Sequence, residues 1–102
     1  MFVIIAKAEC RPDKRTEMIK VLQAVAAESR QEAGCRSYRF LADIDDDNAF
    51  ASIEEWESRQ AIDEHFATAH VATMMAALPD LLASQPVIEV HEIAATTGPP
   101  AG

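Results

Sequence analysis

The chain changes from a strand pattern to a helix pattern within residues 50–70, which read FASIEEWESRQAIDEHFATAH. The alternation in the first half of this stretch predicts a strand that ends at Trp56, the only tryptophan. Ser58 is a candidate N-cap for the helix that follows. His65 and His70 come nine and fourteen residues after the tryptophan. This order predicts that an indole and an imidazole lie at the mouth of one cavity.

Successive side chains of a strand point to opposite faces. One face of the predicted strand therefore carries an aromatic ring, a hydroxyl, a carboxylate and an indole, from Phe50, Ser52, Glu54 and Trp56. On the following helix, His65 shares a side with Ala61 and Ile62, which are expected to face inward. We therefore expect the imidazole to approach the same wall of side chains.

The start of the chain predicts a strand and a long helix. Val and Ile are frequent over residues 2–9, which indicates a central strand that becomes exposed at its end. Asp13, after Pro12, is a fair N-cap for a helix that runs to about Glu32. Gly34 follows at a position where glycine often ends a helix in the left-handed conformation, and we expect it to be the C-terminal cap.

A hairpin is expected between the two helical regions. Residues 35–44 alternate and predict its first strand, with Tyr38 and Ile44 on the same face. Residues 45–48 read DDDN, which is typical of a tight turn. The chain then returns through residues 49–56 as the partner strand.

The second half of the chain predicts two helical pieces and a last strand. Thr68 is expected to interrupt the helix that Ser58 begins, and Pro79 to restart the piece that follows. Pro86 ends the helical region, and residues 87–94 predict the fourth strand. We expect residues 1–94 to form a single domain and residues 95–102 to form a flexible tail.

The order strand, helix, strand, strand, helix, strand is that of the ferredoxin-like α+β fold with an antiparallel sheet. Right-handed crossovers place the first strand between the third and the fourth. The helices then cover one face of the sheet, and the other face keeps apolar side chains that a monomer should not expose. The pattern therefore predicts a homodimer through the open sheet face.

Composition excludes several classes of partner. The net charge of −8 argues against nucleic acid and against an anionic membrane surface. No apolar stretch approaches a membrane span, and the first ten residues lack the features of a signal peptide, so we expect a cytoplasmic protein.

Cysteine and histidine are too few for a disulfide scaffold or a preformed zinc site. Cys10 and Cys35 should lie at opposite edges of the sheet, which argues against a disulfide between them. No glycine-rich phosphate loop or dinucleotide fingerprint is present. The sequence therefore predicts no metal and no tightly held cofactor.

Each candidate residue also has a purely structural interpretation. A single tryptophan is more often part of a core, and Tyr38 could fill the core as easily as it could donate a hydrogen bond into a pocket. His65 could be a hydrogen-bonded core histidine. His70 is expected to be a cap or a surface residue, and His91 to be exposed or at a dimer edge.

Four motifs resemble those of the antibiotic-biosynthesis monooxygenase (ABM) family of dimeric α+β barrels. They are RP at residues 11–12, EAGCRSY at 32–38, EEWES at 54–58 and AIDEHFATAH at 61–70. The similarity covers residues 1–94, and quinol-oxidising members look closest. Characterised members oxidise hydroquinols or electron-rich aromatic polyketides with dioxygen, using no metal or flavin.

The resemblance implies a homodimer with a substrate cavity between sheet and helices in each subunit. His65 would accept or donate a proton, and Trp56 would form an aromatic wall and offer its indole N–H. The other residues expected to contact a small aromatic substrate are Phe50, Ser52, Glu54, Tyr38 and Phe66.

The chain departs from the family pattern at two positions. Ser52 stands where some polyketide-oxidising members have an asparagine. Haem-degrading members use an asparagine on the first strand, where this chain has only Ala6 and its apolar or charged neighbours. The sequence therefore favours a cofactor-independent monooxygenase that acts on a hydroquinol or polyphenol. The alternatives are a non-oxidative isomerase of a small metabolite and a non-catalytic dimer that binds a small ligand.

Overall fold

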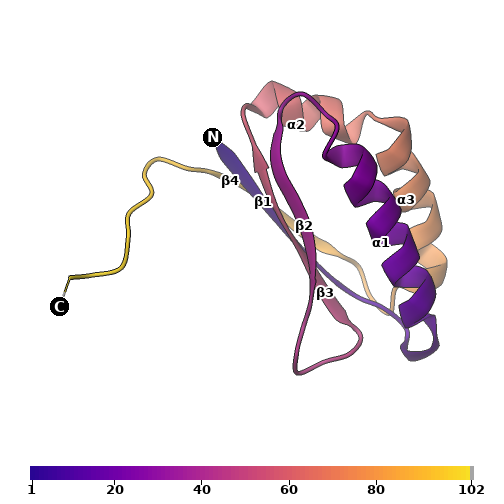
Figure 1. The fold of residues 1–102 in the computed structure, drawn as a ribbon. Helices are drawn as coiled ribbons and strands as arrows, with labels where there is room; N and C mark the ends of the chain where they lie inside the picture. The colour runs from indigo at the N-terminus through magenta and orange to yellow at the C-terminus, as the bar shows by residue number, and fades with distance from the viewer. Residues whose placement is uncertain (102) are drawn as a thin grey trace.

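The computed structural model describes residues 1–101, and its elements follow one another in the predicted order (Figure 1). The first half holds β1 (Phe2–Glu9), the 3₁₀ turn η1 (Pro12–Lys14), α1 (Arg15–Ser29) and β2 (Cys35–Ala42). The second half holds β3 (Ala49–Trp56), α2 (Arg59–Phe66), α3 (Ala69–Leu81) and β4 (Val87–Glu92).

The four strands form one antiparallel sheet in the order β2-β3-β1-β4. β1 thus lies between β3 and β4, as the crossover rule predicted. Figure 1 shows the helices packed together on one face of the twisted sheet. The predicted ferredoxin-like α+β fold is confirmed.

The covered face of the sheet carries the core, because alternate strand residues point toward the helices. The four alternate residues of β3 that were predicted to share a face are all buried: Phe50, Ser52, Glu54 and Trp56. Met18 and Leu22 of α1 pack with Leu78 of α3 and hold these two helices together. Each fully buried side chain of this kind contributes roughly 1.5–3 kcal/mol to folding.

The end of α1 differs from the prediction. The helix ends at Ser29, so Glu32 lies in the turn before β2 and not in the helix. Gly34 does not have the positive φ of a left-handed cap. It is needed for a close approach, because a Cβ at this position would lie 2.3 Å from the Cβ of Ala61 in α2.

The cap at Ser58 and the interruption at Thr68 agree with the prediction, whereas the role of Thr68 as the cap of α3 was not predicted. The Ser58 hydroxyl accepts a hydrogen bond from the Ala61 N–H and caps α2. Thr68 interrupts the helical region and caps α3 by accepting from the Val71 N–H. Pro79 does not restart a helix, because α3 runs through it and ends two residues later at Leu81. A proline inside a helix lacks the N–H that would donate to the carbonyl four residues back, here that of Met75, so the last turn of α3 has one hydrogen bond fewer.

Two strands are shorter than predicted. β2 ends at Ala42, and Ile44 is 98% exposed in the acidic turn, where it does not share the buried face of Tyr38. β4 ends at Glu92, and the chain from residue 95 to residue 101 forms no helix or strand. Figure 1 shows this tail extending away from the domain. Its flexibility stays a prediction, and Gly102 lies outside the described residues.

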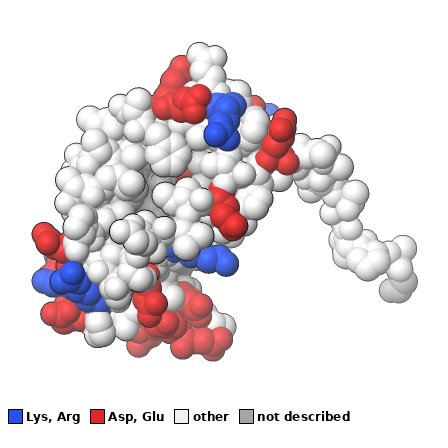
Figure 2. Space-filling model, turned by 180° about the vertical axis from the view of Figure 1, so that it is seen from behind, with Lys and Arg blue, Asp and Glu red and all other residues white. Residues whose placement is uncertain are grey.

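The sheet face turned away from the helices carries apolar side chains. Three of them are 43–56% exposed: Leu41, Ile53 and Val87. Figure 2 shows acidic side chains at the lower end of the molecule, the end where Figure 1 places the β2–β3 turn.

Within residues 1–101, no helix is both long and apolar enough to cross a membrane. Cys10 is buried and Cys35 half-buried, and both are free thiols. Strand register places Cys35 at the end of the sheet that holds Phe2 and Trp56, whereas Cys10 follows Glu9 at the other end.

Candidate active site

An apolar cavity lies between the covered face of the sheet and the helices. It has a volume of about 60 Å³. Its walls come from all four strands and from α1, α2 and α3. The structure brings six of the seven predicted site residues to these walls: Tyr38, Phe50, Ser52, Glu54, His65 and Phe66.

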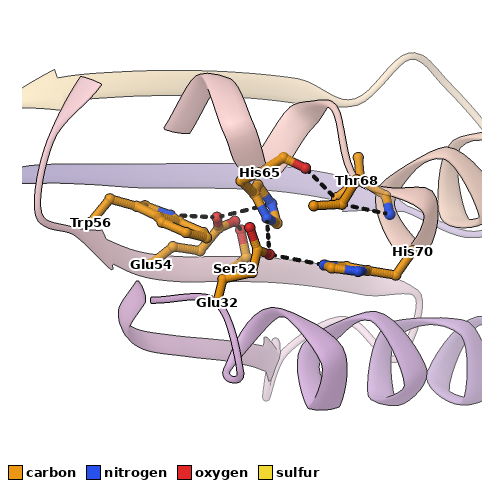
Figure 3. A network of polar contacts seen from close by, with 8 residues as sticks. Glu32, Ser52, Glu54, Trp56, His65, Thr68 and His70 are labelled. Carbon is orange, nitrogen blue, oxygen red and sulfur yellow. Dashed lines mark hydrogen bonds and ion pairs between the residues drawn. The ribbon is translucent and has the colours of Figure 1, made fainter. Parts of the chain in front are cut away.

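Most of the wall is aliphatic or aromatic, and the polar groups are concentrated on β3 and α2. Glu54 sits between its strand neighbours Ile4 and Tyr38 in the register of the sheet. His65 projects from the last turn of α2 toward the same strand. Figure 3 shows Ser52, Glu54 and His65 turned toward one another. A few polar groups in an apolar cavity are the usual composition of a small-molecule site.

Glu54 is a buried carboxyl group with two hydrogen-bond donors. Ser52 Oγ donates to Oε2 at 2.7 Å, and Trp56 Nε1 donates to Oε1 at 3.1 Å. Desolvation by burial raises the pKa of Glu54, while these two hydrogen bonds and the nearby His65 oppose the rise. A carboxyl group with a raised pKa can hold or release a proton nearer neutral pH.

Trp56 occupies a different place from the one expected. It is fully buried and does not line the cavity. Its indole N–H is already bonded to Glu54, so it is not free to hold a substrate oxygen. The indole packs against His65, with ring centroids 4.4 Å apart. Trp56 therefore contacts Glu54 and His65 from the side away from the cavity and helps to hold both side chains in place.

His65 lies between two carboxylates. Its Nδ1 is 2.7 Å from Glu32 Oε2, and its Nε2 is 4.0 Å from Glu54 Oε1. The side chain is only 3% exposed. The two ring nitrogens therefore face different carboxyl groups, and Nε2 is the nitrogen on the side of the cavity residue Glu54.

Glu32 and His70 are site residues that the sequence did not reveal. His70 was expected to be a cap or a surface residue, but its Nε2 lies 2.8 Å from Glu32 Oε2, the same oxygen that contacts His65 (Figure 3). Glu32 is 33 residues from His65 along the chain and 38 from His70. Such a separation leaves no periodic signal, and only the folded chain brings the three together.

The same three side chains are the described residues whose donor atoms could converge on a metal ion. Those atoms lie within 4.8 Å of one another. Two ligands on a tetrahedral zinc ion are roughly 3.3 Å apart, since each is about 2.0–2.2 Å from the metal. The nitrogen–oxygen distances of 2.7 and 2.8 Å are shorter and are those of hydrogen bonds. We therefore assign this cluster to hydrogen bonding.

A model of the family described as "Antibiotic biosynthesis monooxygenase" (ABM) matches residues 1–77. The chain belongs to the ABM family. The match includes β1, both strands of the hairpin and two polar residues of the cavity wall, Glu54 and His65. The predicted family resemblance is therefore confirmed.

The chain is also similar to individual proteins. The chain is 38% identical to the uncharacterized protein sll1783 of Synechocystis sp. over 92% of its own length, and it spans 64% of that relative. It is 30% identical to the Bacillus subtilis protein named "Putative monooxygenase YcnE", covering 82% of this chain and 88% of the relative. The structure of Rv0793 from Mycobacterium tuberculosis superposes with a TM-score of 0.88 at 29% identity, covering 95% of this chain and 98% of the other.

Two further side chains shape the cavity of this ABM domain. Tyr38 is buried, and desolvation followed by the nearby Glu54 raises the pKa of its hydroxyl well above the usual range, so it stays protonated. Phe66 is 42% exposed, and its ring contacts the His65 ring edge-on. Tyr38 therefore closes the inner wall, and Phe66 stands where the cavity meets solvent.

Proposed function

We propose that this ABM-family protein is a cofactor-independent monooxygenase that oxidises a small electron-rich aromatic compound, a hydroquinol or polyphenol, with dioxygen. One observation carries the proposal: a buried acid–base pair, His65 and Glu54, lines a mostly apolar cavity. An apolar cavity suits an aromatic ring, and the acid–base pair suits its hydroxyl group.

The chemistry begins with a proton transfer. A phenolic O–H that points at His65 gives its proton to Nε2, and the phenolate that forms is a far better electron donor than the phenol. Dioxygen accepts electrons from this phenolate and forms a bond to the ring carbon. One oxygen atom stays in the product, and the other leaves as water.

The electrons of this reaction balance without an external reductant. Reducing dioxygen to one water and one inserted oxygen atom takes four electrons, and a hydroquinol that becomes a hydroxyquinone supplies all four. The protein then has to bind the ring, accept the proton and return protons to the departing oxygen. His65 and Glu54 are placed for these proton transfers because both line the cavity.

The size of the cavity limits the substrate. An engineered cavity that binds benzene has a volume of about 150 Å³, whereas this one has about 60 Å³. The cavity must therefore widen even for one ring. Three exposed apolar side chains among its lining residues can move to allow this: Phe66, Met75 and Ile88. A single-ring substrate fits this limit better than a fused polyketide.

We also propose that the protein is a homodimer formed through the open sheet face. Strand register places Leu41, Ala51, Lys7 and Val87 in one row across this face and Arg39, Ile53, Ile5 and Glu89 in the next. Both rows contain exposed apolar side chains, which association would remove from water.

The test of the dimer is Ile53→Lys, which puts a charge in the middle of this face and should give a monomer by light scattering. Ile44→Lys is the matched control, because Ile44 is 98% exposed in the turn. If the wild type is a monomer, the proposed dimer does not form. If the dimer survives Ile53→Lys, its interface lies outside the open sheet face.

The test of the activity is oxygen consumption by metal-stripped protein with a panel of single-ring hydroquinols. Wild type should exceed the autoxidation rate, His65→Ala should not, and His91→Ala, which alters the exposed histidine of β4, should retain activity. Turnover without oxygen would instead indicate an isomerase that uses the same acid–base pair. Binding without any turnover would indicate a ligand-binding role.

A further inference from the structure

His65 can act as a proton acceptor only if Nε2, the nitrogen on the cavity side, is free of a proton in the resting site. A neutral imidazole carries one proton, on either Nδ1 or Nε2. The group bonded to the other nitrogen decides which. The identity of that group is therefore part of the mechanism.

Glu32 is the group bonded to the other nitrogen. Its Oε2 lies 2.7 Å from His65 Nδ1, on the side of the ring away from Glu54. Neither Glu32 nor His70 lines the cavity. Figure 3 shows His65 in contact with both Glu54 and Glu32, and Glu32 in contact with His70.

The turn that carries Glu32 is held in place by its backbone. Its N–H donates to Ser29 O, and its carbonyl accepts from the Cys35 N–H, both at 3.1 Å. His70 is held by α3, whose cap Thr68 also donates from its hydroxyl to His65 O at 2.7 Å. The turn that carries Glu32 is therefore fixed locally, and the bond from Thr68 ties the start of α3 to the end of α2.

We propose that Glu32 is a positioning residue: it keeps the His65 proton on Nδ1, leaves Nε2 open to the cavity and stabilises the imidazolium that forms there. His70 donates from Nε2 to the same carboxylate oxygen and holds it in place. This inference rests on the proposed function for its catalytic consequence, but the proton position in the resting protein is independent of any substrate.

The physical basis is a charge-assisted hydrogen bond in a nearly dry site. The side chain of Glu32 is 16% exposed and that of His65 is 3% exposed. A carboxylate accepts but cannot donate, so it requires a proton on the nitrogen that it contacts. When Nε2 takes a proton from a substrate, the ring becomes positive and Glu32 offsets the charge. The proton on Nδ1 stays where it is.

The test is the position of the His65 proton, measured from the ¹⁵N chemical shifts of the imidazole nitrogens at a pH where they no longer change. Wild type should have the proton on Nδ1. Glu32→Gln keeps the shape of the side chain but can turn an amide N–H toward Nδ1, so the proton should move partly or wholly to Nε2. Glu28→Gln is the matched control, since Glu28 is exposed on α1, and it should leave the shifts unchanged.

A proton on Nε2 in wild type would overturn the inference, and this measurement needs no variant to fold. Unchanged shifts in a folded Glu32→Gln protein would also overturn it. With an active substrate, Glu32→Gln should lower kcat by about 10²- to 10⁴-fold and change KM little. Unchanged kcat would contradict the role of Glu32, whereas an inactive wild type with the proton on Nδ1 would contradict only the proposed function.

Discussion

Gly34→Ala tests how the turn before β2 fixes the position of α2. The new Cβ would lie 2.3 Å from the Cβ of Ala61, while carbon atoms in contact are about 3.5–4.0 Å apart. The turn and α2 must therefore separate by roughly 1.2 Å or more. Neither atom is the end of a flexible side chain, so the strain falls on the backbone.

Overpacking of this kind costs typically 1–3 kcal/mol. For a domain of about 100 residues, each 1 kcal/mol lowers Tm by about 4–8 °C. We expect Gly34→Ala to lower Tm by about 4–24 °C in thermal unfolding at a fixed protein concentration. Gly98→Ala is the matched control, because a Cβ at Gly98 would meet nothing within 4 Å, and its Tm should be unchanged.

A second substitution identifies the clash. Ala61→Gly removes the atom that the new Cβ would meet and by itself costs about 1 kcal/mol for a glycine in a helix. The double variant should then be more stable than the sum of the two single losses predicts. Strictly additive losses would refute the assigned contact. Since α2 carries His65, Gly34→Ala should also reduce activity, because a displacement of about 1 Å at a catalytic group can cost on the order of 10²-fold.

Three other predictions concern Glu54 and Cys35. The folded-state pKa of Glu54 is raised above its ordinary value of 4.5. The protonated carboxyl group therefore favours the folded state below pH 4.5, and this stability is lost as the pH rises through the folded-state pKa. Glu54→Gln should therefore gain in Tm relative to wild type as pH increases, and parallel Tm curves would contradict this. Trp56→Phe removes the indole donor to Glu54 and should cost roughly 1.5–3 kcal/mol in chemical unfolding followed by circular dichroism; a loss of only a few tenths would count against that hydrogen bond. Burial raises the pKa of Cys35 to about 11 from 9.0, so alkylation at pH 8 in a Cys10→Ser background should be about a hundredfold slower than for a free thiol, and a normal rate would show that the thiol is not desolvated.

The strand side of the site could be predicted from the sequence because it depends on local rules. Alternation alone placed Phe50, Ser52 and Glu54 on one face, and the structure buries all three. Cap chemistry located Ser58 at the start of α2 in the same way. These signals span only a few residues, so tertiary packing had little room to override them.

The helix side of the site could not be predicted because it depends on contacts between distant segments. The pattern of α1 continues past Ser29, and nothing local shows that Glu32 has left the helix. A glycine is required at position 34 because Ala61 of α2 lies close to it. The His70 side chain is only partly exposed because it contacts Glu32, which lies in the turn before β2. Trp56 shows a further limit, because the sequence placed it on the correct face but could not show that Glu54 takes its N–H.

The most direct test of the proposed monooxygenase is the fate of labelled dioxygen. A hydroquinol that the protein turns over is allowed to react under ¹⁸O₂, and the product is reduced at once to prevent oxygen exchange with water before mass spectrometry. The account predicts one ¹⁸O atom per product molecule, with the other in water, and loss of this labelled product in His65→Ala. Product without ¹⁸O, or the same product formed under nitrogen, would contradict it.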